Sequence, residues 1–492
     1  MLSFADKVRP PALSYGDVML EPGASEVLPR EVDLSTRIGR RIRLNLPLLS
    51  AAMDTVTEAP LAIALAREGG MGVIHKNLGI EEQAAQVRRV KRAESGVIDD
   101  PVVLGPTDTV GRARQLMQEK RIAGIPVVEG DGRLAGIVTR RDLRFGAEDA
   151  AAVGTVMTRD DLVTAPAGTS LSEAQRILQK HRIEKLPLVD PAGRLRGLVT
   201  VRDLQNRRQF PDASKDGRGR LRVGAALGVG AAMRDRAAAL VESGVDMVFI
   251  DSAHGHARGV VEAVEWFKGE YGGTELAAGN IATAAAARDL VRAGADAVKV
   301  GIGPSAICTT RVVAGIGVPQ VSAVLSCAEE AAKTGATVIA DGGVTQSGDL
   351  TKAVAAGAHA VMVGLLLAGT DESPGETVHY QGRTFKVYRG MGSLAAMREG
   401  GAERYFQGEA EAAKLVPEGV EGQVPYRGSL AGVVYQLAGG LRAGMGYCGC
   451  RDLDSLRREG RFVRVSASGV RESHPHDVAV TREAPNYWNV QG

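Results

Sequence analysis

The chain has 492 residues, of which 44% are hydrophobic and 24% charged, a balance typical of a globular protein with two or three domains and not of a disordered or fibrous one. Sixty Lys and Arg residues against 58 Asp and Glu leave a formal charge of +2, which argues against a dedicated nucleic-acid-binding protein. Four cysteines are too few for a disulfide framework, the N-terminus lacks a secretory pattern, and no apolar stretch approaches the length of a membrane span, so we expect a cytoplasmic protein.

In chain order, short apolar segments alternate with helical patterns in the two outer parts of the chain. This alternation predicts a parallel sheet, and the polar or glycine residues that end each segment favour an α/β fold of the (β/α)8 TIM-barrel type, with its site at those ends. An open doubly wound sheet is the alternative, which the lack of a G-x-G-x-x-G fingerprint in the first unit weakens. The eight predicted strands lie within residues 45–55, 69–75, 222–229, 246–256, 274–281, 296–304, 336–344 and 359–367.

An internal repeat interrupts this pattern. The segment Arg121–Leu143 returns 61 residues later as Arg182–Leu204, and each copy follows a helical pattern, contains two predicted strands and ends in Thr-x-x-Asp. We therefore predict an insertion at 94–207, formed by two units at about 94–150 and 155–207. The barrel would comprise residues 1–93 and 208–492, because an insertion at a loop tip disturbs the host core little.

The repeated pair resembles tandem CBS domains, modules that bind adenine or guanine nucleotides. The resemblance implies a regulatory purine-nucleotide site at Thr139, Asp142, Thr200 and Asp203, where the Asp would hold a ribose. The alternative is that each Asp only caps the turn that follows it. Because the motif recurs in both copies, we favour the nucleotide site.

The segment Lys299–Gln320 carries the clearest sign of chemistry. A predicted strand opens there into a glycine-rich loop with Cys308 and Thr310, a setting in which backbone amides or a cation can stabilise a thiolate nucleophile. The alternative for a lone cysteine is a buried, inert side chain, which fits Cys327. The single C-x-C at 448–450 is weak evidence for zinc.

Glycines also end two later predicted strands. Gly342, Gly343 and Gly364 lie in the last third of the predicted barrel, where such folds often bind phosphate, and glycine lets backbone amides approach an anion closely. Tight turns that barrels need anyway are the equally weighted alternative.

Together these segments resemble the IMP dehydrogenase / GMP reductase family, in its bacterial dehydrogenase form, over essentially the whole chain. The loop matches the family at Gly301, Gly303, Cys308, Thr309 and Thr310. Further matches, in order, are SAAMDTVTE (50–58), DSAHGH (251–256), AGNIAT (278–283), DGG (341–343), YRGMGS (388–393), RYFQ (404–407), PEGVEG (417–422) and ESHPHD (472–477).

The resemblance implies NAD-dependent oxidation of inosine 5′-monophosphate (IMP) to xanthosine 5′-monophosphate, the committed step of guanine nucleotide synthesis. Cys308 would add to C2 of the purine, and Thr310, Arg404 and Tyr405 would activate water once a flap at about 393–427 closes. Arginine normally stays protonated, so the role of Arg404 as the base rests on the motif. The implied IMP-binding residues are Asp341 (for the ribose), Gly342, Gly343, Gly364, Leu365, Tyr388, Gly390, Met391, Gly392, Glu418 and Ala306, and the implied cofactor-binding residues are Asp251 (for the ribose), Asn280, Gly301, Ile302 and Gly303.

The family also uses a potassium ion held by backbone carbonyls. The matching positions are Gly303, Ser305 and Cys308 in one subunit, with Glu472, Ser473 and His474 from a neighbouring one. Carbonyl ligands suit such a cation, and a shared site implies an oligomer, so we expect a homotetramer and leave an octamer open.

Two departures from the family affect the phosphate site. Ser305 and Ala306 replace the usual Gly-Ser, and Leu365 replaces a serine, so two hydroxyls are missing. Ser305 would be strained if the glycine it replaces has positive φ. We therefore expect an active dehydrogenase with a raised KM for IMP, since each hydrogen bond to a charged group contributes about 1.5–3 kcal/mol.

Two alternative functions stay open. GMP reductase shares the barrel, the Cys loop and the covalent intermediate, but lacks the Arg-Tyr pair that this chain has at Arg404 and Tyr405. From a different class, a catalytically weak purine-nucleotide sensor would explain the lost serines, although the retained Cys308, Thr310 and Glu418 count against it.

Overall fold

A computed structural model describes residues 7–94, 98, 101–120, 122–144, 148–408, 410–482 and 484–487. The chain forms two compact units: the first is Met1–Lys91, Asp212–Ser214 and Leu221–Gly492, and the second is Arg92–Pro211 and Lys215–Arg220. The domain assignment made from the sequence stays a prediction. Within the described ranges, no helix is long and apolar enough to cross a membrane.

The first unit contains a closed barrel of eight parallel strands, which confirms the predicted fold class and excludes the open sheet. Every strand lies within one of the eight segments predicted from the sequence, and nearly all of the strand residues are buried. The strands are β4 (Leu48–Ser50), β5 (Met71–Ile74), β11 (Val223–Leu227), β12 (Met247–Asp251), β13 (Glu275–Ile281), β14 (Ala297–Val300), β15 (Thr337–Asp341) and β16 (Ala360–Val363). Because β5 pairs directly with β11, the second unit leaves the order of the barrel strands undisturbed.

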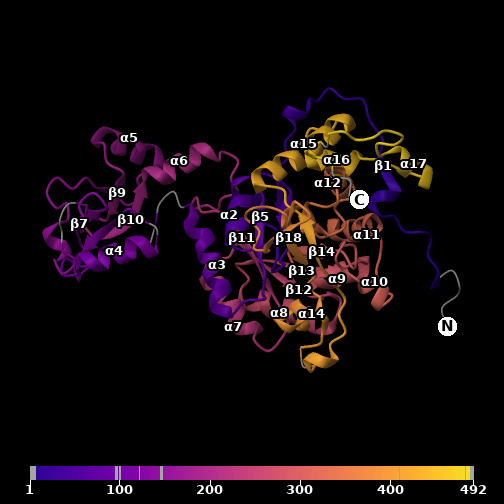
Figure 1. Ribbon diagram of the computed structural model, residues 1–492, viewed down its shortest axis with the longest axis horizontal. Helices are drawn as coiled ribbons and strands as arrows, with labels where there is room; N and C mark the ends of the chain where they lie inside the picture. Colours follow the sequence, from indigo (N-terminus) through magenta and orange to yellow (C-terminus); the bar gives the residue numbers. More distant parts are fainter. Residues whose placement is uncertain are drawn as a thin grey trace. The chain divides into compact units, whose positions relative to one another are not determined.

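Helices follow the strands and cover the outside of the barrel (Figure 1). They are α2 (Ala59–Arg67), α3 (Ile80–Ala93), α7 (Met233–Glu242), α8 (Arg258–Glu270), α9 (Ala284–Arg292), α11 (Gln320–Ala332), α12 (Ser347–Ala355) and α15 (Leu430–Cys448). Local sequence explains their bounds: the Thr283 hydroxyl caps α9 by accepting from the Ala286 N–H, and α15 ends at Gly449 with φ +70°. Inside the barrel, a core that includes Met71, Phe249 and Ile339 fills the space between the strands.

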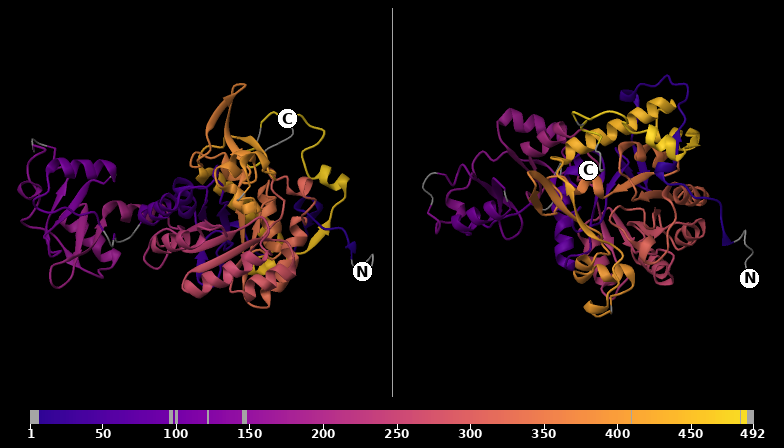
Figure 2. Two further views of the ribbon diagram at one scale, coloured as in Figure 1. Left: turned by 90° about the horizontal axis from the view of Figure 1, so that it is seen from below. Right: turned by 45° about the vertical axis from the view of Figure 1, so that its right-hand side comes forward.

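Shorter elements extend the barrel. An antiparallel sheet of β17 (Thr377–Tyr380), β18 (Arg383–Arg389) and β19 (Glu421–Pro425) projects from it, drawn in orange in the left view of Figure 2. Strand β1 (Val18–Leu20) pairs with β20 (Phe462–Arg464), and β2 (Thr36–Ile38) pairs with β3 (Ile42–Leu44). The remaining short helices are α10 (Thr310–Val313), α13 (Leu365–Ala368), α14 (Leu394–Arg398), α16 (Leu453–Glu459) and α17 (Ala467–Glu472).

The second unit shows the predicted repeat. Each copy has a helix followed by a pair of antiparallel strands. Two backbone hydrogen bonds join the two strand pairs: the Leu134 N–H donates to the Gly193 carbonyl (3.0 Å), and the Leu195 N–H donates to the Gly132 carbonyl (3.1 Å). The first copy contains α4 (Val110–Glu119), β6 (Gly124–Val128) and β7 (Leu134–Thr139), and the second contains β8 (Ala165–Pro166), α5 (Leu171–His181), β9 (Lys185–Val189), β10 (Leu195–Thr200) and α6 (Val201–Gln209).

Candidate functional site

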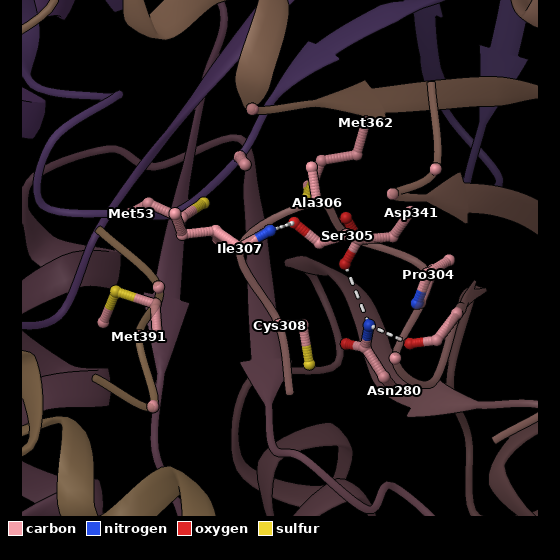
Figure 3. A pocket seen from close by; sticks show the side chains of 18 of the residues that line it. Met53, Asn280, Pro304, Ser305, Ala306, Ile307, Cys308, Asp341, Met362 and Met391 are labelled. Atoms are coloured by element: carbon pink, nitrogen blue, oxygen red, sulfur yellow. Dashed lines mark hydrogen bonds between the residues drawn. The ribbon is translucent and has the colours of Figure 1, made fainter. Parts of the chain in front are cut away.

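A cavity of about 300 Å³ opens at the carboxyl ends of the barrel strands. In Figure 3, Met53 and Met391 lie on one side of the Cys308 loop, and Asn280 and Asp341 on the other. The cavity brings together every residue that the sequence suggested for catalysis, IMP or NAD: Cys308, Thr310, Arg404, Tyr405, Asp341, Gly342, Gly343, Gly364, Leu365, Tyr388, Gly390, Met391, Gly392, Glu418, Ala306, Asp251, Asn280, Gly301, Ile302 and Gly303.

The Cys308 loop leaves β14 through two glycines that its path requires. Gly301 has φ +153° and a Cβ there would collide with the Asp341 carbonyl, while Gly303 has φ +73°. The Cys308 thiol is partly exposed and donates to the Thr310 hydroxyl across 3.1 Å. The loop is held from the other side because the Thr309 N–H donates to the Glu418 carbonyl at 2.9 Å. A potential nucleophile and a hydroxyl thus face the same cavity.

Lys299 is a residue of the site that the sequence analysis missed. Its side chain is 3% exposed, and its ammonium group lies 2.9 Å from the Asp251 carboxylate and 2.5 Å from that of Asp341. The ammonium group also donates to the Asn280 side-chain carbonyl. The Asn280 amide in turn donates to Asp341 (2.9 Å) and to the Gly301 carbonyl (2.7 Å). One buried cation therefore joins the carboxylate expected to bind IMP and the one expected to bind NAD. The sequence feature that could have identified Lys299 is a charged residue within an otherwise apolar strand.

Arg404 and Tyr405 reach the cavity from the 3-10 helix η4 (Gly401–Tyr405). The Arg404 guanidinium forms an ion pair with Asp251, and the Ala253 N–H donates to the Arg404 carbonyl at 2.9 Å. Burial lowers the pKa of Arg404, which a hydrogen bond to Tyr405 partly offsets, and burial raises the pKa of Tyr405. The Asp251 carboxylate, in contrast, stabilises the protonated guanidinium, so the role of Arg404 as a base still rests on the motif.

The glycine-rich turns of the seventh and eighth barrel strands meet next to the Cys308 loop. Gly342 and Gly343 have φ +90° and +80°, and Gly364 precedes the short helix α13, an arrangement that often binds phosphate in such barrels. A Cβ on Gly364 would lie 3.1 Å from the Tyr388 hydroxyl. Burial raises the pKa of Tyr388 to about 12, against the effect of a hydrogen bond to Ser305.

The expected backbone strain at Ser305 is wrong. Ser305 is not among the described non-glycine residues with positive φ, so a side chain is accommodated there. Its hydroxyl lines the cavity and accepts from the Ile307 N–H at 3.5 Å. The loop therefore keeps a hydroxyl, displaced by one position from the place where Ala306 lacks one.

Other predicted residues lie outside this cavity. Glu472 ends α17, and Ser473 and His474 follow it, all exposed, so this chain does not bring them to its own Cys308 loop. Among the residues that the structure describes, no group of three or more His, Cys, Asp or Glu side chains is placed to hold a metal ion.

In the repeated unit, the Asp142 side chain bonds back to Thr139, at the start of its own motif. Its carboxylate accepts from the Thr139 N–H at 2.7 Å and from the Thr139 hydroxyl at 2.6 Å. Thr200 ends β10, and the side chain of Asp203 lies outside the described part of the chain. A nucleotide at these residues stays a prediction.

Three comparisons place the chain among known proteins. A family model described as "IMP dehydrogenase / GMP reductase domain" matches residues 12–476. The inosine-5′-monophosphate dehydrogenases of Halalkalibacterium halodurans and Bacillus subtilis are each 57% identical to it, covering 98% and 96% of this chain and 99% and 97% of theirs. Among solved structures, a GMP reductase variant of Trypanosoma brucei in complex with guanosine 5′-monophosphate superimposes with a TM-score of 0.89 at 41% identity, covering 97% of this chain and all of that one.

Proposed function

Because the chain belongs to the IMP dehydrogenase / GMP reductase family, we propose that it is an NAD-dependent IMP dehydrogenase, which oxidises IMP to xanthosine 5′-monophosphate. The observation that carries the proposal is the meeting of Cys308, Thr310, Arg404 and Tyr405 in one cavity. A nucleophile and a water-activating pair are the two sets of groups that oxidation followed by hydrolysis requires.

In the first half of the proposed reaction, the Cys308 thiolate forms a bond to C2 of the purine, which is electrophilic because it lies between two nitrogens. The hydride on C2 leaves with its electron pair; NAD, when bound, accepts it. Asp341 holds the ribose of IMP, Met391, Gly392 and Glu418 contact the base, and the glycine turns face the phosphate, as their places in the cavity allow.

In the second half, a water oxygen bonds to C2, the bond from C2 to the Cys308 sulfur breaks, and the thiolate is released. Arg404, the base that the motif implies, would accept a proton from that water in its neutral form, after it has left Asp251, assisted by Tyr405 and Thr310. The Asp251 carboxylate fits a cofactor ribose, but here it pairs with Arg404 and Lys299. Arg404 must therefore move away before NAD engages Asp251, which separates the two halves in time.

The proposal includes a potassium ion and an oligomer. The Cys308 loop carries the carbonyls of Gly303, Ser305 and Cys308, and oxygen ligands suit a hard monovalent cation, which would brace the loop that carries the nucleophile. Exposed Glu472, Ser473 and His474 would complete the site in a homotetramer, with an octamer open. Purine nucleotides at the repeated unit and a cytoplasmic location complete the proposal.

GMP reductase is the second candidate, favoured by the likeness to the Trypanosoma brucei structure. Steady-state NADH formation with IMP and NAD, with and without potassium, alongside NADPH consumption with GMP, distinguishes the two. We expect potassium-dependent NADH formation that is lost in Cys308→Ala. NADPH consumption alone would make the protein a reductase, and silence in both assays would favour the nucleotide sensor.

A further inference from the structure

An ion pair outside the cavity holds the turn that delivers Arg404. Lys76 follows β5, and its side chain is 8% exposed. Its ammonium group lies 3.2 Å from the Glu403 carboxylate and donates to the Gly400 carbonyl, also at 3.2 Å. It thus fixes two points of the segment 400–407, which we call the 400–407 turn. Burial lowers the pKa of Lys76, and the nearby Glu403 opposes that effect.

The Glu403 carboxylate also packs closely against the backbone that follows β11, at Gly228 and Gly230. A Cβ on Gly230 would collide with it, and a Cβ on Gly228 would lie 3.1 Å from it. Arg236 also attracts this carboxylate electrostatically. Its guanidinium, however, donates its hydrogen bonds to Gln83 (2.7 Å) and to the Leu78 carbonyl (3.0 Å). Lys76 is therefore the cation that holds Glu403 directly, at the edge of a polar cavity of about 700 Å³.

Glu403 immediately precedes Arg404, whose side chain points into the other cavity and pairs with Asp251. Glu403 and Arg404 are thus held by different partners, Lys76 and Asp251. Because the two residues are adjacent in the chain, a displacement of Glu403 must also displace Arg404. We propose that Lys76 is a positioning residue: its ion pair with Glu403 holds the 400–407 turn against the barrel and so places the Arg404 guanidinium at the site of water activation.

The catalytic consequence rests on the proposed function. Hydride transfer uses Cys308 and does not need Arg404, whereas hydrolysis does. Loss of the ion pair frees the turn, slows hydrolysis and releases Asp251 for the cofactor. Lys76→Met should keep the presteady-state burst of NADH, lower the steady-state rate at least about tenfold and lower the KM for NAD. It removes both contacts of Lys76, and the loss of a single hydrogen bond to a charged group is already about a tenfold effect or more.

Two readouts on the full-length protein test this proposal. The first is NADH formation, as burst and steady state, and the second is hydrogen exchange at the amides of Phe406 and Gln407, which are bonded within the turn. Arg258→Met is the matched control, since it removes an exposed ion pair to Glu262 on α8. Glu403→Gln repeats the test with little risk to folding, because the Glu403 side chain is 43% exposed. The double variant Lys76→Glu with Glu403→Lys reverses the charges of the pair and should restore part of the lost steady-state rate.

We expect faster exchange and a lowered steady-state rate in Lys76→Met and Glu403→Gln, with both unchanged in Arg258→Met. Exchange at the wild-type rate would overturn the proposal, as would a burst that falls in parallel with the steady-state rate. If the wild-type protein forms no NADH, the proposed function fails, while the exchange experiment still decides whether Lys76 holds the turn.

Discussion

Ser305 supplies a hydroxyl at the edge of the glycine turns, where Ala306 and Leu365 lack one. Its unstrained backbone and its place in the lining of the cavity make it the candidate phosphate donor. We predict that Ser305→Ala raises the KM for IMP about tenfold with little change in kcat, because one hydrogen bond to a charged group is lost. Ala306→Ser should lower that KM.

Steady-state kinetics over a range of IMP concentrations measures both effects, with saturating NAD. A change in kcat without a change in KM would show that Ser305 orients the catalytic loop and does not hold the phosphate.

The titration of His359 should make the free energy of unfolding depend on pH. Burial, with Arg457 and Arg37 nearby, lowers its pKa to about 3, and its Nδ1 accepts from the Val338 N–H at 3.2 Å. Between pH 6.5 and 3 the unfolded chain takes up a proton that the folded one refuses, so stability falls with falling pH by up to about 1.4 kcal/mol per unit.

His359→Asn removes this titration and keeps an acceptor. Urea unfolding at pH 7, 6, 5 and 4 should therefore show a shallower loss of stability in His359→Asn than in the wild type. The exposed His379→Asn is the control, and equal slopes in all three proteins would contradict the prediction.

At the scale of residues, the motifs predicted which side chains gather in the cavity but not how they pair. Arg404 and Asp251 are 153 positions apart in the chain, and nothing in either segment indicates that they form an ion pair. The lowered pKa of Arg404 depends on burial by the surrounding elements, which no local pattern encodes.

Elements pack against one another closely enough for one methyl group to matter. A Cβ on Gly72 in β5 would lie 2.5 Å from the backbone of Ala62 in α2. We predict that Gly72→Ala destabilises the barrel by about 1–3 kcal/mol, since helix and strand must separate. Gly259 on α8 has open space, so Gly259→Ala should leave stability unchanged or raise it. Calorimetric unfolding of the two variants checks the opposite signs.

The eight barrel strands could be predicted because each is a buried apolar run that ends in glycine or a polar residue. The sheet of β17, β18 and β19 was not predicted: β17 and β18 alternate weakly, and β19 joins them from 32 residues further on, across segments that look like polar loop. Strands of three residues such as β1 and β20 are too short to show a period, and they pair the two ends of the chain.

In the whole molecule, one carboxylate of the first unit, that of Asp246, joins the chain segments on the two sides of the insertion. Lys91, at the end that leaves, donates to Asp246 at 2.7 Å and to the Leu221 carbonyl at 3.0 Å. At the end that returns, the Val223 N–H donates to the same carboxylate at 2.8 Å. All of these contacts join residues of the first unit.

We accordingly predict that the first unit folds and acts without the second. Replacing residues 92–211 by a short Gly-Ser linker removes the second unit except for residues 215–220. It keeps Ser214, whose hydroxyl donates to the Gly69 carbonyl at 2.6 Å. This variant should form NADH from IMP and NAD at close to the wild-type rate and should lose any response to added purine nucleotides. A soluble, folded variant without activity would contradict the prediction.

The ion pair between Arg404 and Asp251 has a consequence for affinity. On the proposed assignment, Arg404 is a competing ligand tethered to the protein, and tethered groups act at effective concentrations on the order of millimolar. The affinity measured for NAD is then a net value, after this internal competitor has been displaced. Any change that loosens the tether makes the cofactor bind more tightly and hydrolysis slower, so the protein cannot improve cofactor affinity and turnover independently by this route.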